Sequence, residues 1–349
     1  MELGIALVGF GNVAQGLARI LIRKRDLLTI RYGIIPVVKA VVTGSKGTLW
    51  DPSGLDLEAV LDSMANLKNL SGVSALPATL DEILKGDEIS VVVDTTPTDL
   101  VTGEPGLSII KRAIESGKHV VSSSKGPVSV ALPELTDLAS RHGVAYRFEG
   151  ALLSGTPSIN LAMEAMAGCD VVKVQGIVNG TTNYILTRME EGMGYEDALS
   201  EAQDRGYAEA DPSGDVDGWD AAVKAQIIAS VIMGEPISLD QVERRGISEI
   251  SRDDVIAALD RGNRIKLIAQ VERRGRDVIA SVSPMELPLD HPLAGVMGAT
   301  NAITYETDNL KDVTIVGPGA GREETGQALL ADLLAIFRER GGLVVRRSA

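Results

Sequence analysis

Aromatic residues, cysteine and histidine are scarce in this chain of 349 residues. Aromatic residues make up 3% of it, so aliphatic side chains and alanine must fill the core, and platforms for stacked bases are not expected. The one cysteine, Cys169, excludes an intrachain disulfide. The three histidines (His119, His142 and His291) lie far apart in the sequence and lack the spacing of a metal site.

Positive charge and long apolar runs are also lacking. The formal net charge is −14, whereas nucleic-acid binding depends on Lys and Arg that neutralise phosphates. The sequence contains no run of about 18 apolar residues, the length needed to span a membrane. The N-terminal stretch carries Glu2 and lacks the basic region of a signal peptide. We therefore expect a cytoplasmic protein that binds neither nucleic acid nor a membrane.

Short apolar runs alternate with helical patterns over the first 125 residues or so. We expect strands at 3–8, 37–42, 89–94 and 118–122, with a further strand at 144–149, and helices at 12–26, 57–65 and 106–116. This alternation predicts parallel strands joined by right-handed crossovers.

The pattern then becomes mixed. Helices are expected at 156–167, 195–205, 218–233 and 323–340, strands at 171–178, 301–307, 313–316 and 343–346, and a hairpin at 265–272 and 278–286. We predict an α/β fold: a Rossmann doubly wound parallel sheet with an inserted mixed α/β domain. The dinucleotide-binding domain would cover 1–130 and 308–349, and the substrate-binding domain 131–307.

The first predicted strand runs into a G-x-G-x-x-A fingerprint at residues 9–14. Gly9 allows the tight turn, and Gly11 lets the backbone approach a pyrophosphate that faces the helix N-terminus. A glycine turn without a ligand is the alternative. The position between a strand and a helix favours a dinucleotide site formed by Gly9, Gly11, Asn12 and Val13.

The second predicted strand ends without the carboxylate that usually binds the ribose of NAD. Thr43, Ser45 and Lys46 stand there instead and suit a 2′-phosphate, so NADP is favoured over NAD, although they could be ordinary loop residues.

Two further segments are candidates for cofactor contact. Thr95 ends another strand, at the edge where ligands of open α/β sheets gather. Gly319 and Gly321 precede the last helix, in a glycine loop that either admits a ligand or is an ordinary turn.

The densest run of polar residues lies at 202–224. Asp217 is expected to be the N-cap of the helix at 218–233. Asp220 and Lys224 are four positions apart, so their side chains share one helix face. Spacing alone favours a surface ion pair. The functional interpretation places Lys224 beside a reacting oxygen, with Asp220 orienting it.

This run resembles the signature of homoserine dehydrogenases. The pattern A-x-x-x-G-hydrophobic-small, then Asp-Pro, then Asp-hydrophobic-x-Gly-x-Asp-x-x-x-Lys is filled from Ala202 to Lys224. The blocks NGTTNYIL at 179–186 and SKGP at 124–127 are similar to two further family segments, although Ser124 and Gly126 depart from the family's usual residues. The resemblance extends from Gly9 to Gly321.

The resemblance implies NAD(P)-dependent interconversion of L-aspartate 4-semialdehyde and L-homoserine, in threonine, methionine and isoleucine biosynthesis. It implies that Lys224 exchanges a proton with the substrate oxygen and that Asp220 holds it. Lys125, with Ser124, would lie near the carbonyl and the nicotinamide. The chemistry fits, because hydride arriving at an aldehyde carbon leaves an alkoxide-like oxygen that a positive group stabilises and protonates.

The resemblance also implies how the amino-acid substrate is bound. Glu209 and Asp215 would bind its ammonium, and Gly180, Thr181 and Tyr207 would line its pocket. A site for Na⁺ or K⁺ is implied at Glu149, Leu152, Ser154 and Thr156. A homodimer paired through the second domain is expected, because the family is commonly dimeric. The chain ends soon after the last predicted helix, so we expect no C-terminal regulatory domain.

Three other functions share parts of this sequence pattern. An aspartate-semialdehyde dehydrogenase needs a thiol nucleophile, and Cys169 is better interpreted as a buried core residue because no histidine is near it in sequence. An amino-acid dehydrogenase that releases ammonia is a second alternative. A dinucleotide sensor would not need to keep Asp215, Asp220 and Lys224 together.

Overall fold

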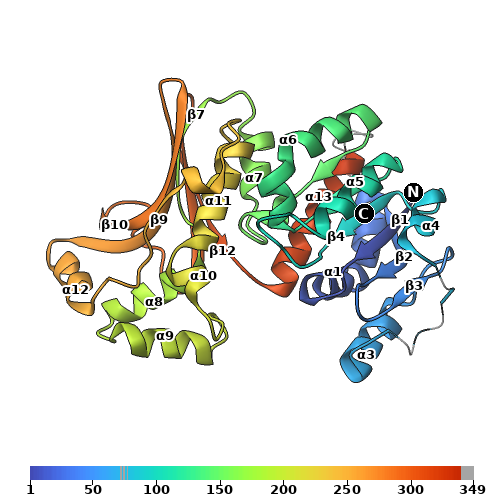
Figure 1. Cartoon of the computed structure of the whole chain (residues 1–349), viewed down its shortest axis with the longest axis horizontal. Coiled ribbons are helices and arrows are strands. Elements are labelled where there is room, and N and C mark those ends of the chain that lie inside the picture. The colour runs from blue at the N-terminus through green and yellow to red at the C-terminus, as the bar shows by residue number, and fades with distance from the viewer. Residues whose placement is uncertain (71–72, 74, 77, 339–349) are drawn as a thin grey trace. The chain divides into compact units, whose positions relative to one another are not determined.

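The computed structural model describes residues 1–349 except 71, 72, 74, 77 and 339–349, so the predicted strand at 343–346 lies outside the described residues (Figure 1). The chain forms two compact units, Met1–Gly155 with Gly321–Ala349, and Thr156–Ala320. The α/β fold with an inserted second unit is confirmed. In the structure both boundaries between the units lie further along the chain than the expected residues 130 and 308. The strand at 146–147 still pairs with the first sheet, and the hairpin at 300–318 belongs to the second.

Six strands form the sheet of the first unit in the order β3-β2-β1-β4-β5-β6. They are β1 (Glu2–Val8), β2 (Ile35–Val42), β3 (Thr48–Trp50), β4 (Val91–Asp94), β5 (His119–Ser122) and β6 (Tyr146–Arg147). All neighbours pair in parallel except β3, which forms an antiparallel hairpin with β2. The predicted parallel sheet is confirmed. β3 was not predicted, because three residues are too few to show a period of two.

Helices pack against this sheet. Helices α1 (Asn12–Arg23) and α13 (Arg322–Arg338) lie against each other and share a buried core with Leu3, Ile5 and Leu7 of β1. A second pair, α5 (Gly106–Glu115) and α6 (Lys125–His142), packs near β4 and β5. The shorter elements are α2 (Arg25–Leu27), η1 (Leu28–Tyr32), α3 (Leu57–Leu67), α4 (Leu80–Lys85) and η2 (Glu149–Ala151).

The sheet of the second unit has the order β12-β11-β7-β9-β10-β8. Its strands are β7 (Val171–Ile177), β8 (Glu243–Arg244), β9 (Asn263–Arg274), β10 (Asp277–Pro288), β11 (Thr300–Thr307) and β12 (Lys311–Pro318). All neighbours are antiparallel except β10 and β8. The predicted β9–β10 hairpin is confirmed and is among the longest elements in Figure 1.

Two central helices of the second unit are buried on nearly all sides. They are α8 (Gly180–Glu190) and α11 (Trp219–Val231), and α11 packs against β9 and β10. Around them lie α7 (Ser158–Asn160), η3 (Leu161–Ala165), α9 (Tyr195–Asp204), α10 (Ser213–Val216), η4 (Leu239–Gln241) and α12 (Arg252–Asp260). A helix buried all round shows no amphipathic stripe, which is why α8 could not be predicted from its pattern. Within the described part of the chain, no helix has the length and apolar character needed to cross a membrane.

Two glycines let α1 and α13 approach each other. A Cβ atom on Gly16 would lie 2.1 Å from the carbonyl oxygen of Arg322, and one on Gly326 would lie 2.6 Å from the amide nitrogen of Leu17. Both neighbours are backbone atoms, so a side chain at either position would force the helices apart.

The substitution Gly16→Ala tests this contact. Alanine is favoured over glycine in a helix by up to about 1 kcal/mol, yet overpacking here is expected to lower the free energy of unfolding by about 1–3 kcal/mol. Urea unfolding measures the change. Gly44→Ala is the control, because a Cβ atom there would meet no atom within 4 Å. A Gly16→Ala variant as stable as the parent would show that the helices are not in this contact.

Candidate active site

The predicted site residues fall into two groups, one in each unit, and each group is described within its own unit. In the second unit the group is built around the start of α11. The ammonium of Lys224 lies 2.7 Å from a carboxylate oxygen of Asp220, one helical turn earlier. The Lys224 side chain is 7% exposed and that of Asp220 19%. The two residues therefore do not form an ordinary surface ion pair.

A second bond fixes the Lys224 ammonium. Its Nζ donates to the carbonyl oxygen of Val178 at 2.6 Å, at the end of β7. A buried ammonium needs such acceptors, because loss of hydration disfavours the charge. The lysine is therefore held between its own helix and the segment that leads into α8.

Asn179 connects the acidic residues of this group. Its Nδ2 donates to Asp215 Oδ1 at 2.6 Å and to Asp220 Oδ2 at 3.0 Å. Its Oδ1 accepts from the amide of Thr182 at 2.9 Å and so caps α8. One amide therefore orients two carboxylates and begins a helix. Asn179 was quoted in the family-like block but was not predicted as a site residue, because its bonds join positions far apart in sequence.

The carboxylate of Asp215 is held in an unfavourable environment. Burial raises the pKa of Asp215 above its usual 3.8, and the negative charge of Asp220 raises it further. Hydrogen bonds from Asn179 and Thr181 and the charge of Lys224 oppose the rise in the pKa but do not cancel it. A partly buried, destabilised carboxylate of this kind gains from a cationic partner such as a substrate ammonium.

The first turn of α8 is tied to the segment that follows α9. Thr181 Oγ1 donates to the carbonyl of Tyr207 at 2.6 Å, and the Tyr207 ring lies 4.8 Å from that of Tyr184, centroid to centroid. Tyr207 is 45% exposed. Glu209 is exposed as well, and its carbonyl accepts from Gln203 Nε2. The structure thus brings Asp215, Thr181 and Tyr207 near one another, whereas Glu209 contributes a backbone atom to this connection.

In the first unit the fingerprint has the expected conformation. Gly9 has φ +86°, and a Cβ atom there would lie 2.6 Å from the carbonyl oxygen of Thr95, so only glycine fits. Gly11 precedes α1, and a Cβ atom on it would meet nothing within 4 Å. Asn12 is exposed and Val13 half-buried. The open space at Gly11, before the amides of a 12-residue helix, fits a phosphate group.

The ends of β1, β4 and β5 are joined by a polar network around Asp94. The carboxylate of Asp94, which is fully buried, accepts from Ser122 Oγ at 2.8 Å and from Thr96 Oγ1 at 2.7 Å. Thr95 donates from its Oγ1 to the carbonyl of Gly9 at 3.1 Å. Ser124 donates to the carbonyl of Thr96 at 3.2 Å.

The same network places Lys125, which is the first residue of α6 and is half-buried. The fingerprint, Thr95, Ser124 and Lys125 therefore share one edge of the parallel sheet, as expected for a dinucleotide-binding domain. α6 was not predicted, since it contains Pro127 and Pro133 and has non-helical backbone at Ala131.

The turn after β2 holds the candidate 2′-phosphate residues. Thr43 Oγ1 donates to the carbonyl of Gly47 at 2.8 Å and accepts from the Lys46 amide at 2.9 Å. The Thr43 hydroxyl therefore closes the turn. Ser45 is exposed and Lys46 half-exposed, and their side chains are the ones in this turn that suit a ligand.

The glycine loop after β12 makes room for a buried side chain. A Cβ atom on Gly319 would lie 2.1 Å from the side-chain amide of Asn301, so this glycine makes room for Asn301. The Asn301 side chain is buried, and its nitrogen and oxygen have no hydrogen-bond partner among the described residues. Buried amides of this kind are generally satisfied by a water molecule or a ligand. Asn301 was not predicted from the sequence. Gly321 precedes α13 in the first unit.

The residues expected to bind a monovalent cation lie on either side of the change between units. Glu149 begins η2 and is 1% exposed, and its amide donates to Asp332 Oδ2 at 2.8 Å. Leu152 is buried, and Ser154 shares a hydrogen bond of 2.6 Å with Thr325. Thr156 belongs to the second unit, where its Oγ1 donates to the carbonyl of Pro318 at 2.9 Å.

Two smaller expectations were wrong. Cys169 is half-buried and lies in the turn before β7, after Gly168 at φ +91°, rather than in the core. The N-cap of α11 is Gly218 at φ +82°, not Asp217. In both cases a glycine in the left-handed conformation redirects the chain, which a side-chain pattern does not reveal.

Taken together, the second unit holds an ammonium, two carboxylates and an amide in one buried polar group. Among the described residues, no cluster of three or more His, Cys, Asp or Glu could hold a metal ion. The arrangement can exchange a proton through Lys224 and bind a cation through Asp215. It lacks a thiol or hydroxyl nucleophile paired with a histidine.

Comparison with known families identifies one enzyme family for both units of the chain. The family model described as homoserine dehydrogenase matches residues 157–334, and the model described as the NAD binding domain of homoserine dehydrogenase matches residues 9–149. Together they include the predicted site residues of both units except Leu152, Ser154 and Thr156, which lie between the two matches.

Individual relatives extend over nearly the whole chain. A homoserine dehydrogenase from Methanocaldococcus jannaschii is 40% identical over 95% of this chain and 98% of its own length. An NAD(+)-dependent homoserine dehydrogenase from Pseudomonas canavaninivorans is 39% identical, covering 97% of each chain.

Solved structures show the same similarity. A putative homoserine dehydrogenase from Archaeoglobus fulgidus has a TM-score of 0.86 at 38% identity and covers 96% of this chain and 99% of its own. A hyperthermophilic archaeal homoserine dehydrogenase in complex with NADPH has a TM-score of 0.82 at 30% identity, covering 99% of this chain and 100% of its own.

Removing the Asp215 charge has a predictable effect on stability. Because the pKa of Asp215 is raised in the folded state, the stabilising contribution of this group is fully present below pH 3.8 and is lost as pH rises through the raised pKa. Asp215→Asn keeps the neutral form at every pH. We expect the melting temperature of the parent to fall relative to that of Asp215→Asn as pH is raised from 3 to 7. A difference that is flat or grows in the parent's favour would mean that this carboxylate is not destabilised.

Proposed function

The chain belongs to the homoserine dehydrogenase family, and we propose that the buried group of Lys224, Asp220, Asp215 and Asn179 carries its chemistry. The reaction is the NAD(P)-dependent interconversion of L-aspartate 4-semialdehyde and L-homoserine, in amino-acid biosynthesis. The observation that carries the proposal is the 2.7 Å pair of Lys224 and Asp220, buried and connected to Asp215 through one amide.

Lys224 acts as the general acid in the reducing direction and as the base in the reverse direction. The bound nicotinamide supplies or accepts the hydride. The ammonium of Lys224 stabilises the negative charge that develops on the substrate oxygen and transfers a proton to it. Asp220 orients the lysine, because its carboxylate accepts a charge-assisted hydrogen bond from the ammonium at 2.7 Å.

The amino-acid end of the substrate is recognised by charge. Asp215 binds its ammonium. This cationic partner offsets the desolvation that raises the pKa of the Asp215 carboxylate. Gly180 and Thr181 begin α8, an 11-residue helix whose N-terminus favours the substrate carboxylate. Tyr207 lines the pocket through its bond with Thr181, and Glu209 adds negative charge at the exposed rim.

The first unit binds the dinucleotide. Gly9, Gly11, Asn12 and Val13 receive the pyrophosphate, as supported by the open space at Gly11. Thr95 and Ser124 border the nicotinamide side, and Lys125 lies near the reacting carbonyl. Gly321, which precedes α13 in this unit, completes the boundary of the cofactor site, and Gly319 lies two residues earlier in the same glycine loop. Ser45 and Lys46 bind a 2′-phosphate, with Thr43 shaping their turn, so NADP is preferred.

Three further features complete the proposal. A Na⁺ or K⁺ ion is bound at Glu149, Leu152, Ser154 and Thr156. A rate of homoserine oxidation that does not depend on either ion would contradict this site. The enzyme is a homodimer joined through the second unit, which sedimentation at the mass of one chain would contradict. It acts in the cytoplasm, which recovery in another cell fraction would contradict.

The variant Lys224→Ala tests the catalytic assignment. We expect kcat for homoserine oxidation to fall by about 10²–10⁴-fold, because the proton-transfer group is lost. Binding of NADP, measured by calorimetry, is expected to stay within about twofold. Lys111→Ala is the matched control, since its ammonium forms an exposed pair with Glu134. Turnover by Lys224→Ala that matches the parent would remove Lys224 from the mechanism.

The variant Lys46→Ala tests cofactor preference. Losing a charge-assisted contact to the 2′-phosphate is expected to raise KM for NADP about tenfold, while KM for NAD stays within about twofold. Steady-state rates with each cofactor at saturating homoserine give both values. An equal change in both KM values would show that Lys46 does not read the 2′-phosphate.

A further inference from the structure

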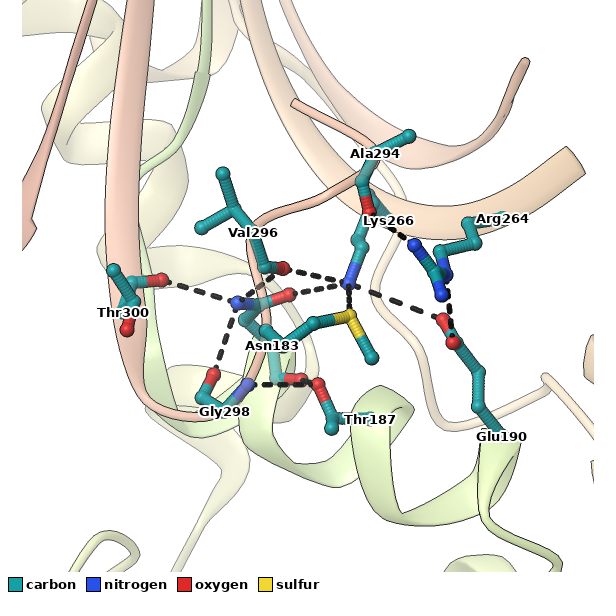
Figure 2. Close-up of polar contacts among 10 residues, drawn as sticks. Asn183, Thr187, Glu190, Arg264, Lys266, Ala294, Val296, Gly298 and Thr300 are labelled. Atoms are coloured by element: carbon teal, nitrogen blue, oxygen red, sulfur yellow. Dashed lines mark hydrogen bonds and ion pairs between the residues drawn. The ribbon is translucent and has the colours of Figure 1, made fainter. Parts of the chain in front are cut away.

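A fully buried lysine lies in the second unit, away from the pair at Lys224. The side chain of Lys266, on β9, is 0% exposed, and its Nζ donates to Asn183 Oδ1 at 3.1 Å and to the carbonyl of Val296 at 2.8 Å (Figure 2). The sulfur of Met297 lies 3.5 Å away. A buried ammonium is costly unless its partners satisfy it, so this residue needs an explanation beyond filling space.

The partner Asn183 joins a loop to the first turns of α8. With Oδ1 directed at Lys266, its Nδ2 donates to the carbonyls of Val296, Gly298 and Thr300 at 3.2, 2.9 and 3.0 Å (Figure 2). Thr187, one turn further along α8, accepts from the Gly298 amide at 3.0 Å. These bonds fasten the β10–β11 loop (residues 289–299) to α8.

The fastened loop touches the residue that begins α8. A Cβ atom on Gly180 would lie 2.7 Å from the carbonyl oxygen of Ala299, the last residue of the β10–β11 loop. Gly180 directly follows Asn179, whose amide orients Asp215 and Asp220. A displacement of this loop would therefore be passed to the backbone that carries the amino-acid-binding residues.

The electrostatic surroundings of Lys266 have few charges. Glu190 of α8 has Oε1 3.9 Å from the ammonium, and Arg264 lies two residues earlier on β9 and binds the same carboxylate at 2.9 Å. Met285 is opposite Lys266 on β10, and α12 turns the apolar residues Val255 and Ala258 inward. Burial lowers the pKa of Lys266 to about 8, with Glu190 opposing the change. Near neutral pH the charged form therefore predominates.

We propose that Lys266 is a positioning residue for the reaction: through Asn183 it holds the β10–β11 loop against α8 and so fixes Asn179 and Gly180 for the amino-acid substrate. This role rests on the proposed function of the group around Lys224. Lys266 itself touches neither substrate nor cofactor in this role. It acts on the geometry of the residues that do.

The substitution Lys266→Met keeps the length of the side chain and removes its donors. We expect KM for homoserine to rise on the order of tenfold or more, since small misplacements of binding groups have effects of this size. KM for NADP should stay within about twofold. Assays are run about 20 °C below the melting temperature of each variant, where it is folded. Lys118→Met is the matched control, because Lys118 is also buried and donates to a carbonyl, that of Gly86, in the first unit.

A double-mutant cycle tests whether the effect passes through Asn183. If it does, Lys266→Met and Asn183→Ala together should lower kcat/KM for homoserine no more than the larger single change, within twofold. Thr187→Val replaces Asn183→Ala if the latter does not fold, and is expected to raise KM for homoserine in the same direction by a smaller factor.

Several results would overturn the proposal. They are an unchanged KM for homoserine in Lys266→Met, a KM shift equal to that of Lys118→Met, or losses that simply multiply in the double variant. An active Lys224→Ala variant would instead refute the assigned mechanism, so the two failures are distinguishable.

Discussion

The buried contact between the Lys224 ammonium and the Asp220 carboxylate is the interaction on which the proposed chemistry depends. An i,i+4 pair on an exposed helix is worth only a few tenths of a kcal/mol. Here the side chains are 7% and 19% exposed, so the charge of one residue requires the other. The same contact brings the start of α11 against the end of β7, through the Val178 carbonyl. The fold of the second unit and the proposed function therefore share one electrostatic constraint.

Asn179 extends this constraint to the substrate side. An amide can donate and accept at once, and here it donates to two carboxylates while it caps α8. Burial raises the pKa of Asp215, and the nearby negative charge of Asp220 raises it further. A carboxylate destabilised in this way suits the binding of a cationic substrate group. Through Asn183 and the β10–β11 loop, the contacts of Lys266 extend to the same short segment of backbone at Gly180.

Features encoded by local order could be predicted from the sequence. The glycine fingerprint, the individual strands of the first sheet and the helical spacing of Asp220 and Lys224 are each encoded by residues close together in the sequence, and the structure contains all of them. The β9–β10 hairpin likewise follows from two alternating runs around a turn.

Features that depend on distant contacts could not be predicted in this way. Asn179 meets Asp215 only after 36 residues of chain have folded back, and Lys266 meets Asn183 across 83 residues. α8 carries no amphipathic stripe because it is buried on almost every side. The role of Glu209 in substrate binding rests on family resemblance. Its side chain is exposed, and its contact with the substrate depends on the bound substrate itself.

A crystal structure with NADP and homoserine bound would test the assigned chemistry most directly. The proposal predicts that the homoserine hydroxyl oxygen lies within hydrogen-bond distance of Lys224 Nζ, at about 2.6–3.2 Å, with the substrate ammonium on the Asp215 carboxylate. A bound homoserine whose hydroxyl lies well beyond that distance from Lys224, with another group as its proton donor, would contradict it.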